Sequence, residues 1–188
     1  PYMASMPEKQ APLDIGALSL SEIEAAIRDR RLPPVEQWNP SHCGHSGMRI
    51  ARDGTWYHEG RAITRPAMTR LFSTVLRREA DGSCVLVTPA EKLTIDVELA
   101  PFVATGMRVE GSGREQAIAF QLHSGDAVVL GPDHPLRTAE GVPLITVRPG
   151  LEASLARPVY YELAELALSD PGRPGIWSRG AFFPLGTE

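Results

Sequence analysis

Lysine is nearly absent from this chain: among its 188 residues it occurs only as Lys9 and Lys92. Lysine and arginine together number 19 against 23 acidic residues, which leaves a net charge of −4 at pH 7. A protein that grips a nucleic-acid backbone needs basic side chains clustered on one surface. The densest basic stretch, residues 28–31, is interrupted by Asp29. The composition therefore excludes nucleic acid as an expected partner.

Cysteine and long apolar runs are scarce as well. Cys43 and Cys84 are too few to cross-link a fold of this size. No apolar run approaches the roughly 20 residues that cross a bilayer, and the first residues lack the charged-then-apolar pattern of a secretory signal. We therefore expect a cytoplasmic protein with no membrane partner. Residues 1–37 are predicted to form a leader followed by a helix.

Sequence motifs that name a reaction are also missing. The chain has no Gly-x-Ser-x-Gly elbow, no phosphate-binding loop and no dinucleotide fingerprint. No cofactor is therefore predicted. Hydrophobic residues make up 43% of the chain, which is enough to bury a core of ordinary size.

A helix is expected within LSLSEIEAAIRDRRLPP, residues 18–34. Either Ser19 or Ser21 can cap it, because each is followed three residues later by a glutamate, which completes a capping box. Two prolines end the helix, since the residue before a proline disfavours helical geometry. The apolar side chains at helical spacing, which mark its buried face, are Leu20, Ile23 and Ile27.

Residues 38–90 are predicted to form a hairpin, a helix and a strand. Asp53-Gly54 is a tight-turn signal, and Pro66 suits the first turn of a helix. A second helix begins at Pro158, and four residues of the first helix region recur there at a constant offset. The matched pairs are Arg65 with Arg157, Pro66 with Pro158, Leu71 with Leu163 and Leu76 with Leu168.

This recurrence predicts the architecture. We expect an α+β protein of unusual fold, with antiparallel β meanders and two small subdomains that share a duplicated hairpin–helix–strand motif. The first repeat subdomain is 38–90, the second is 141–188, and central antiparallel strands occupy 91–140, where apolar and polar residues alternate between short turns. The alternative is two unrelated helices that both start at a proline.

Three histidines and a cysteine gather in NPSHCGHSGMRIARDGTWYHEG, residues 39–60. His42, His45 and His58 are of the type that binds zinc, and Cys43 is a candidate nucleophile beside potential bases. No second pair of ligands with zinc-site spacing accompanies them. No metal is predicted, and the favoured interpretation is a polar hairpin whose histidines are structural or line a cleft.

A second group of residues is predicted to bind a ligand. Carboxylates and phosphates are recognised by arginine forks and lysine, and binding residues concentrate on turns held by a rigid scaffold. The alternative is a solvated strand end with surface ion pairs. The candidate ligand-binding residues are Asp53, Trp56, His58, Arg65, Arg70, Glu91 and Lys92.

The segments CGHSGMRIARDGTWYHEGRAITR, LFSTVLRREADG, LVTPAEK and APF together resemble a bacterial family, domain-of-unknown-function family 1285. The resemblance spans about residues 38 to 140. It implies a mixed α+β fold with repeated structural motifs, and a suggested role in signal transduction without an established ligand or activity. Ala62, Cys84 and Leu99 depart from the family pattern, and Leu99 stands where that pattern has an acid.

The function predicted from these observations is that of a non-enzymatic module. It binds a small anionic ligand or a partner protein, with signal transduction as the context that the resemblance implies. The alternative is a metal-dependent or cysteine-based hydrolase that uses His42, Cys43, His45 and His58. A structural or oligomerising protein, including a homo-oligomer, is the third hypothesis.

Overall fold

The computed structural model describes residues 12–168, 172 and 174–185, so the predicted leader up to residue 11 lies outside the described residues. Its contacts divide the chain into two compact units. Unit 1 contains Arg30–Pro101, and unit 2 contains Pro12–Asp29 together with the chain from Phe102 onward. The chain therefore contributes a segment to unit 2, builds unit 1, and then returns to complete unit 2.

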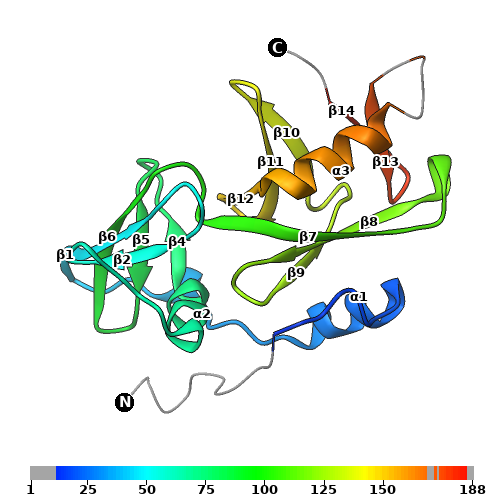
Figure 1. Ribbon diagram of the computed structural model, residues 1–188. Helices are drawn as coiled ribbons and strands as arrows, with labels where there is room; N and C mark the ends of the chain where they lie inside the picture. The colour runs from blue at the N-terminus through cyan, green and yellow to red at the C-terminus, as the bar shows by residue number, and fades with distance from the viewer. Residues whose placement is uncertain (1–11, 169–171, 173, 186–188) are drawn as a thin grey trace. The chain divides into compact units, whose positions relative to one another are not determined.

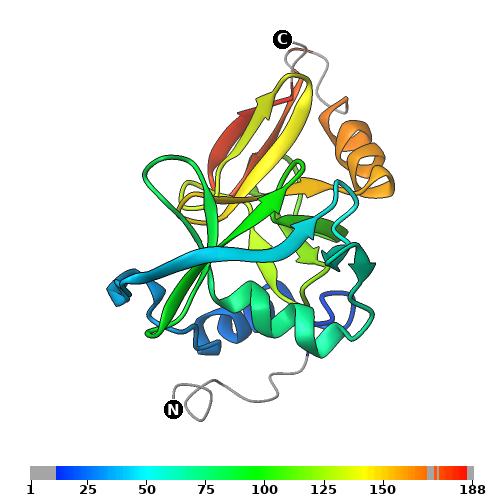
Figure 2. The ribbon, with the colours of Figure 1, turned by 90° about the vertical axis from the view of Figure 1, so that its left-hand side faces the viewer.

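Unit 1 is a six-stranded sheet with the order β3-β2-β1-β6-β5-β4. β1 and β6 run parallel, and the other neighbours are antiparallel. Figure 2 shows α2 lying along one side of this sheet. The elements are η2 (Val35–Gln37), β1 (His42–Ile50), β2 (Trp56–His58), β3 (Arg61–Ala62), α2 (Pro66–Thr74), β4 (Leu76–Arg78), β5 (Cys84–Val87) and β6 (Glu91–Val97).

The predicted hairpin and helix of unit 1 are confirmed. Asp53 Oδ1 accepts a hydrogen bond from the Thr55 backbone N–H at 2.9 Å, which closes the turn between β1 and β2. α2 begins at Pro66, where the missing N–H leaves no helical bond unmade. Trp56 is 2% exposed and stacks on Phe72 of α2, with ring centroids 6.2 Å apart. This contact joins the hairpin to the helix.

Unit 2 contains a second six-stranded sheet, with the order β10-β11-β12-β7-β8-β9. β7 and β12 are its one parallel pair, and α1 packs beside β9 while α3 packs beside β7 (Figure 1). The strands are β7 (Phe102–Glu110), β8 (Ala117–Leu122), β9 (Ala127–Val129), β10 (Leu136–Ala139), β11 (Val142–Arg148) and β12 (Leu151–Leu155). The remaining elements are α1 (Leu20–Asp29), η3 (Gly113–Glu115), α3 (Arg157–Ala167), β13 (Gly175–Ser178) and β14 (Ala181–Pro184).

The two sheets have the same topology, which confirms two similar subdomains in an α+β fold. Counted from the first strand of each unit, both sheets follow the order third, second, first, sixth, fifth, fourth. Each unit also contains a hairpin followed by a Pro-started helix and a strand: β1–β2, α2 and β4 in unit 1, and β11–β12, α3 and β13 in unit 2. The two Pro-started helices lie at different positions in the strand sequence of their units. α2 follows the third strand of unit 1, whereas α3 follows the sixth strand of unit 2.

The predicted capping box of α1 is present at Ser19. The Glu22 N–H donates to Ser19 Oγ at 3.2 Å, and the Ser19 N–H donates to Glu22 Oε1 at 3.1 Å. These hydrogen bonds also lower the pKa of Glu22. The reciprocal bonds satisfy two N–H groups that have no partner within the helix.

The β10–β11 turn offers a test of local strain. Glu140 has φ 52° and Gly141 has φ 79°, the conformation of a two-residue type I′ turn, in which asparagine is strongly preferred at the first position. Replacing Glu140 with asparagine is expected to raise the free energy of unfolding by roughly 0.5 kcal/mol. Urea denaturation measures this, and Glu140→Ala is the matched control. An equal gain for both variants would show that removing the glutamate side chain, and not the turn preference, is responsible.

Candidate functional site

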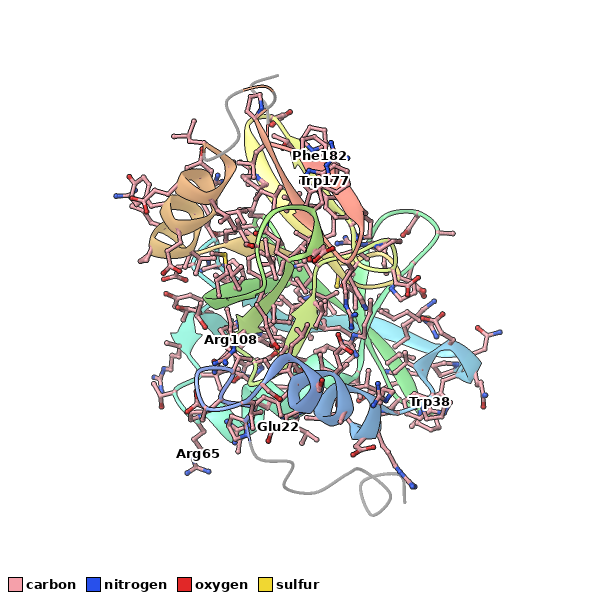
Figure 3. The ribbon with its side chains drawn as sticks, turned by 90° about the vertical axis from the view of Figure 1, so that its right-hand side faces the viewer. Glu22, Trp38, Arg65, Arg108, Trp177 and Phe182 are labelled. Carbon is pink, nitrogen blue, oxygen red and sulfur yellow. The ribbon has the colours of Figure 1, made fainter. Side chains whose placement is uncertain are left out.

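The residues predicted to bind a ligand all lie in unit 1, at separate places. Asp53 closes the β1–β2 turn, and Trp56 lies in the core. Arg65 precedes α2 and points away from the ribbon (Figure 3). Glu91 and Lys92 begin β6. The fold places these two residues beside His42 and Cys43, the candidate metal ligand and the candidate nucleophile. The proposed role of this whole set stays a prediction.

Glu91 and Lys92 lie next to the histidine-rich start of β1 because β1 and β6 pair in parallel from His42 and Glu91 onward. His42 pairs with Glu91, and the distance from His42 Nε2 to Glu91 Oε2 is 3.9 Å. Cys43 pairs with Lys92 in the next position. The parallel pairing therefore brings together residues that are about fifty positions apart in the chain.

The charge of Lys92 is already compensated within unit 1. Its Nζ lies 2.8 Å from Glu79 Oε1, and the Arg77 guanidinium donates two hydrogen bonds to the same carboxylate, at 3.0 and 3.1 Å. Hydrogen bonds from Arg77 first, and from Lys92 second, lower the pKa of Glu79. The bond to Glu79 in turn raises the pKa of Lys92. Lys92 is therefore one member of an ion network with Arg77 and Glu79.

Arg77 extends this network to the segment that precedes β1. Its Nη1 donates to the carbonyl oxygens of Val35 and Trp38, at 2.6 and 2.7 Å. Arg77 is only 8% exposed, so these bonds form away from bulk water. The network holds η2 and the residue after it against β4, which is a structural role.

The histidines and the cysteine of β1 and β2 have separate partners. His45 Nε2 lies 3.6 Å from Asp96 Oδ2, whereas His58 Nε2 lies 4.0 Å from Glu59 Oε1. Cys43 Sγ contacts the Ser41 carbonyl oxygen at 3.9 Å, while the Gly47 N–H donates to His45 Nδ1 at 2.9 Å. Within residues 12–168, 172 and 174–185, no three His, Cys, Asp or Glu side chains are grouped so that they could hold a metal ion. The hydrolase alternative built on these residues stays a hypothesis.

An open cleft of about 460 Å³ lies in unit 2, and none of its lining residues belongs to the predicted set. Three walls enclose it: one side of α1, the turn that follows β9, and the turn between β13 and β14. Its volume falls in the range of small-molecule sites, about 300 to 1,000 Å³. The charged and titratable side chains in these walls are Glu24, Arg28, Asp133, His134 and Arg179.

Arg179 is held in the cleft by a strained turn. It has φ 54° and is followed by Gly180 with φ 79°, so the β13–β14 connection is a two-residue type I′ turn. The left-handed conformation costs a non-glycine residue about 1 to 2 kcal/mol. Gly131 makes room for the arginine, because a Cβ there would lie 3.2 Å from Arg179 Cβ. The guanidinium forms an ion pair with Glu24 of α1.

His134 is anchored beside the cleft through its ring and its backbone. Its Nδ1 lies 3.0 Å from the carbonyl oxygen of Thr146, and a carbonyl oxygen only accepts, so the ring N–H is the donor of this hydrogen bond. The His134 backbone N–H also donates to the Gly131 carbonyl at 3.0 Å, which fixes the turn.

A second open cleft, of about 600 Å³, is also lined by Arg179. Leu20 of α1, Glu110 at the end of β7 and Arg114 of η3 contribute to it. α1 therefore lines both clefts, through Leu20 in one and through Glu24 and Arg28 in the other. Arg179 is the residue that they share.

This cleft was not predicted from the sequence, in which Arg28 was considered only as part of the basic stretch at residues 28–31. One signal was available: Arg179-Gly180 separates two strand-like runs at a position where Asn-Gly is the preferred pair.

Comparison with known proteins identifies the family. Residues 33–100 match the model of a domain of unknown function, the DUF1285 N-terminal domain, and residues 101–185 match that of the DUF1285 C-terminal domain. A crystal structure of a DUF1285 family protein from Silicibacter pomeroyi DSS-3 is 45% identical, with a TM-score of 0.79 over 91% of this chain and 96% of that chain. This chain belongs to the DUF1285 family. The resemblance inferred from the sequence is thereby confirmed.

A more distant DUF1285 structure shares the fold. The family protein from Shewanella baltica OS155 is 20% identical, with a TM-score of 0.50 over 63% of this chain and 91% of that chain. The search of curated proteins finds no match. In the part of the chain that the structure describes, no helix has the length and apolar character needed to cross a membrane. α1 ends at Asp29, ahead of both regions that match the DUF1285 models.

Proposed function

We propose that this DUF1285 protein is a non-enzymatic module that binds a small anionic molecule in the cleft of unit 2. The observation that supports the proposal is the placement of Arg179, whose guanidinium is held at the cleft by a left-handed backbone and by the space that Gly131 leaves. A guanidinium has five N–H donors in a planar fork that matches a carboxylate or a phosphate. Glu24 engages one part of that fork, and the side chain is still 45% exposed.

A second cation belongs to the same cleft. Arg28 lines it from α1, and an arginine keeps its charge at all physiological pH values. Arg28 and Arg179 therefore supply two guanidinium groups to a bound anion.

The chemistry of the lining residues supports binding over catalysis. No serine, threonine or cysteine is among the residues that line this cleft. Covalent catalysis by a hydroxyl or thiol nucleophile would need one of those side chains beside a base. A protein that binds a ligand without transforming it can report the concentration of that ligand, which is the role in signal transduction that we propose for this chain.

Isothermal titration calorimetry with phosphate, glutamate and citrate tests the proposal. At least one of the three is expected to bind, and Arg28→Ala and Arg179→Asn are each expected to weaken it by about 10- to 100-fold, because a hydrogen bond to a charged group contributes about 1.5 to 3 kcal/mol. Asparagine is chosen at position 179 because it favours the type I′ turn, so the fold is retained.

Two controls locate the site. Arg31→Ala removes the same charge three residues after Arg28, outside the cleft, and is expected to change the affinity less than twofold. Arg65→Ala tests the site predicted in unit 1. If none of the three anions binds, or if Arg65→Ala abolishes binding while Arg179→Asn leaves it unchanged, the cleft in unit 2 is not the site.

A further inference from the structure

We infer that α1 is a releasable wall of the cleft, so that anion binding and the docking of α1 on unit 2 are coupled. The inference rests on the proposed function, because the ligand is the anion proposed above. In the docked state α1 supplies Glu24 and Arg28 to the cleft, and a ligand held between Arg28 and Arg179 bridges α1 to the rest of unit 2. Release of α1 removes part of the site.

The chain connectivity makes such a release feasible. Segment 12–29 belongs to unit 2 by its contacts, yet the chain that follows it builds unit 1. Among the described residues of the segment, none forms part of a β-strand. Undocking α1 therefore breaks no strand pairing of the sheet, and the two similar six-stranded sheets keep all their neighbours.

The apolar contact beneath α1 is made by side chains and not by strand pairing. Ile15 and Ile23 are buried against Ala119 and Ala127. Further apolar side chains of the segment pack on this cluster while partly buried: Leu13, Leu18, Leu20 and Ile27. A helix of ten residues is marginal in water by itself, so α1 is stable only while it is docked.

The polar contacts of the segment are few and can be replaced by water. Glu110 Oε2 accepts a hydrogen bond from the Leu20 N–H at 2.8 Å, which caps the start of α1. Arg108 Nη1 donates to the carbonyl oxygens of Ile15 and Gly16, at 3.3 and 3.2 Å. The Leu13 N–H donates to the Gly125 carbonyl oxygen at 2.8 Å.

Arg179 is the residue that couples ligand binding to the docking of α1. The guanidinium that lines the cleft is the one that pairs with Glu24 of α1. A bound anion adds contacts to Arg28, and these contacts exist only when α1 is docked. By linkage, a ligand that binds the docked state alone reduces the undocked population by the factor 1 + [L]/Kd, about 11-fold at ten times the dissociation constant.

Hydrogen exchange on the full chain tests the coupling. The probe is the tightest binder among phosphate, glutamate and citrate. At ten times its dissociation constant, the amides of Leu20–Asp29 are expected to exchange about 11-fold more slowly, while those of the unit 1 sheet are unchanged. Arg28→Ala removes the slowing at the same probe concentration, and Arg31→Ala retains it. Ser19→Ala weakens the capping box, so exchange of α1 is faster in the free protein while the slowing factor stays the same.

The outcomes separate the two proposals. If calorimetry shows binding at the cleft and the exchange of α1 does not change, the coupling is wrong and the binding function stands. Slowing of equal size in both units would indicate general stabilisation, which also overturns the coupling. If none of the three anions binds, the proposed function fails and the inference fails with it.

Discussion

Replacing Arg77 with alanine is expected to lower the free energy of unfolding by about 2 to 4 kcal/mol. The change removes the two hydrogen bonds to Glu79 and leaves the carbonyl oxygens of Val35 and Trp38 without this donor in a nearly buried position. Lys92 still compensates the carboxylate of Glu79, which keeps the expected cost below that of an isolated buried charge. Urea denaturation followed by tryptophan fluorescence is the measurement, because Trp38 and Trp56 both lie in unit 1.

Two variants separate the causes of this loss. Arg77→Lys keeps the positive charge but removes the planar fork, so it is expected to be intermediate. Arg61→Ala removes an arginine from the exposed strand β3 and is expected to change stability by less than about 0.5 kcal/mol. A cost for Arg77→Ala no greater than that for Arg61→Ala would show that the network does not hold unit 1 together.

Replacing Gly175 with alanine is expected to lower the free energy of unfolding by about 1 to 3 kcal/mol. A Cβ at Gly175 would lie 2.2 Å from Phe182 Cζ and 2.8 Å from two further ring atoms. The ring has little freedom to move away, because Phe182 lies beside Trp177 with centroids 5.3 Å apart (Figure 3). Overpacking of this kind forces side chains out of their preferred rotamers.

A double-mutant cycle identifies the cause. In a Phe182→Ala background, Gly175→Ala is expected to cost almost nothing, because the ring that it meets is absent. Gly106→Ala is the matched control, since its nearest neighbour, Gln121 Cβ, would lie 3.6 Å away, an ordinary contact distance. An unchanged cost of Gly175→Ala in the Phe182→Ala background would contradict the collision.

The local elements were predictable because their signals act over a few residues. The turn at Asp53-Gly54, the helix start at Pro66 and the Ser19–Glu22 capping box each depend on backbone preferences or hydrogen bonds within a single turn. The histidine-rich segment forms the predicted hairpin for the same reason. The family was recognisable from motifs within one stretch of chain.

The recurrence found in the sequence predicted two similar subdomains but not how they correspond. Leu76 is buried in β4, whereas its matched residue Leu168 is 75% exposed after α3. The two sheets instead correspond strand for strand, from β1 and β7 onward. That correspondence appears only in the strand pairing, because short strands with different side chains can occupy equivalent positions.

The sequence by itself determined the α+β class, the short-range turns and helix starts, and the family. Tertiary structure alone decided that β1 pairs with β6 and β7 with β12 in parallel, since each pair joins the two ends of a unit and no local signal specifies such a contact. It also decided that α1 packs on unit 2 and forms a cleft with Arg179, more than 150 residues later in the chain. The physical reason is that turn and capping hydrogen bonds and backbone preferences act within a few residues, whereas strand pairing and burial join segments that lie far apart in the chain.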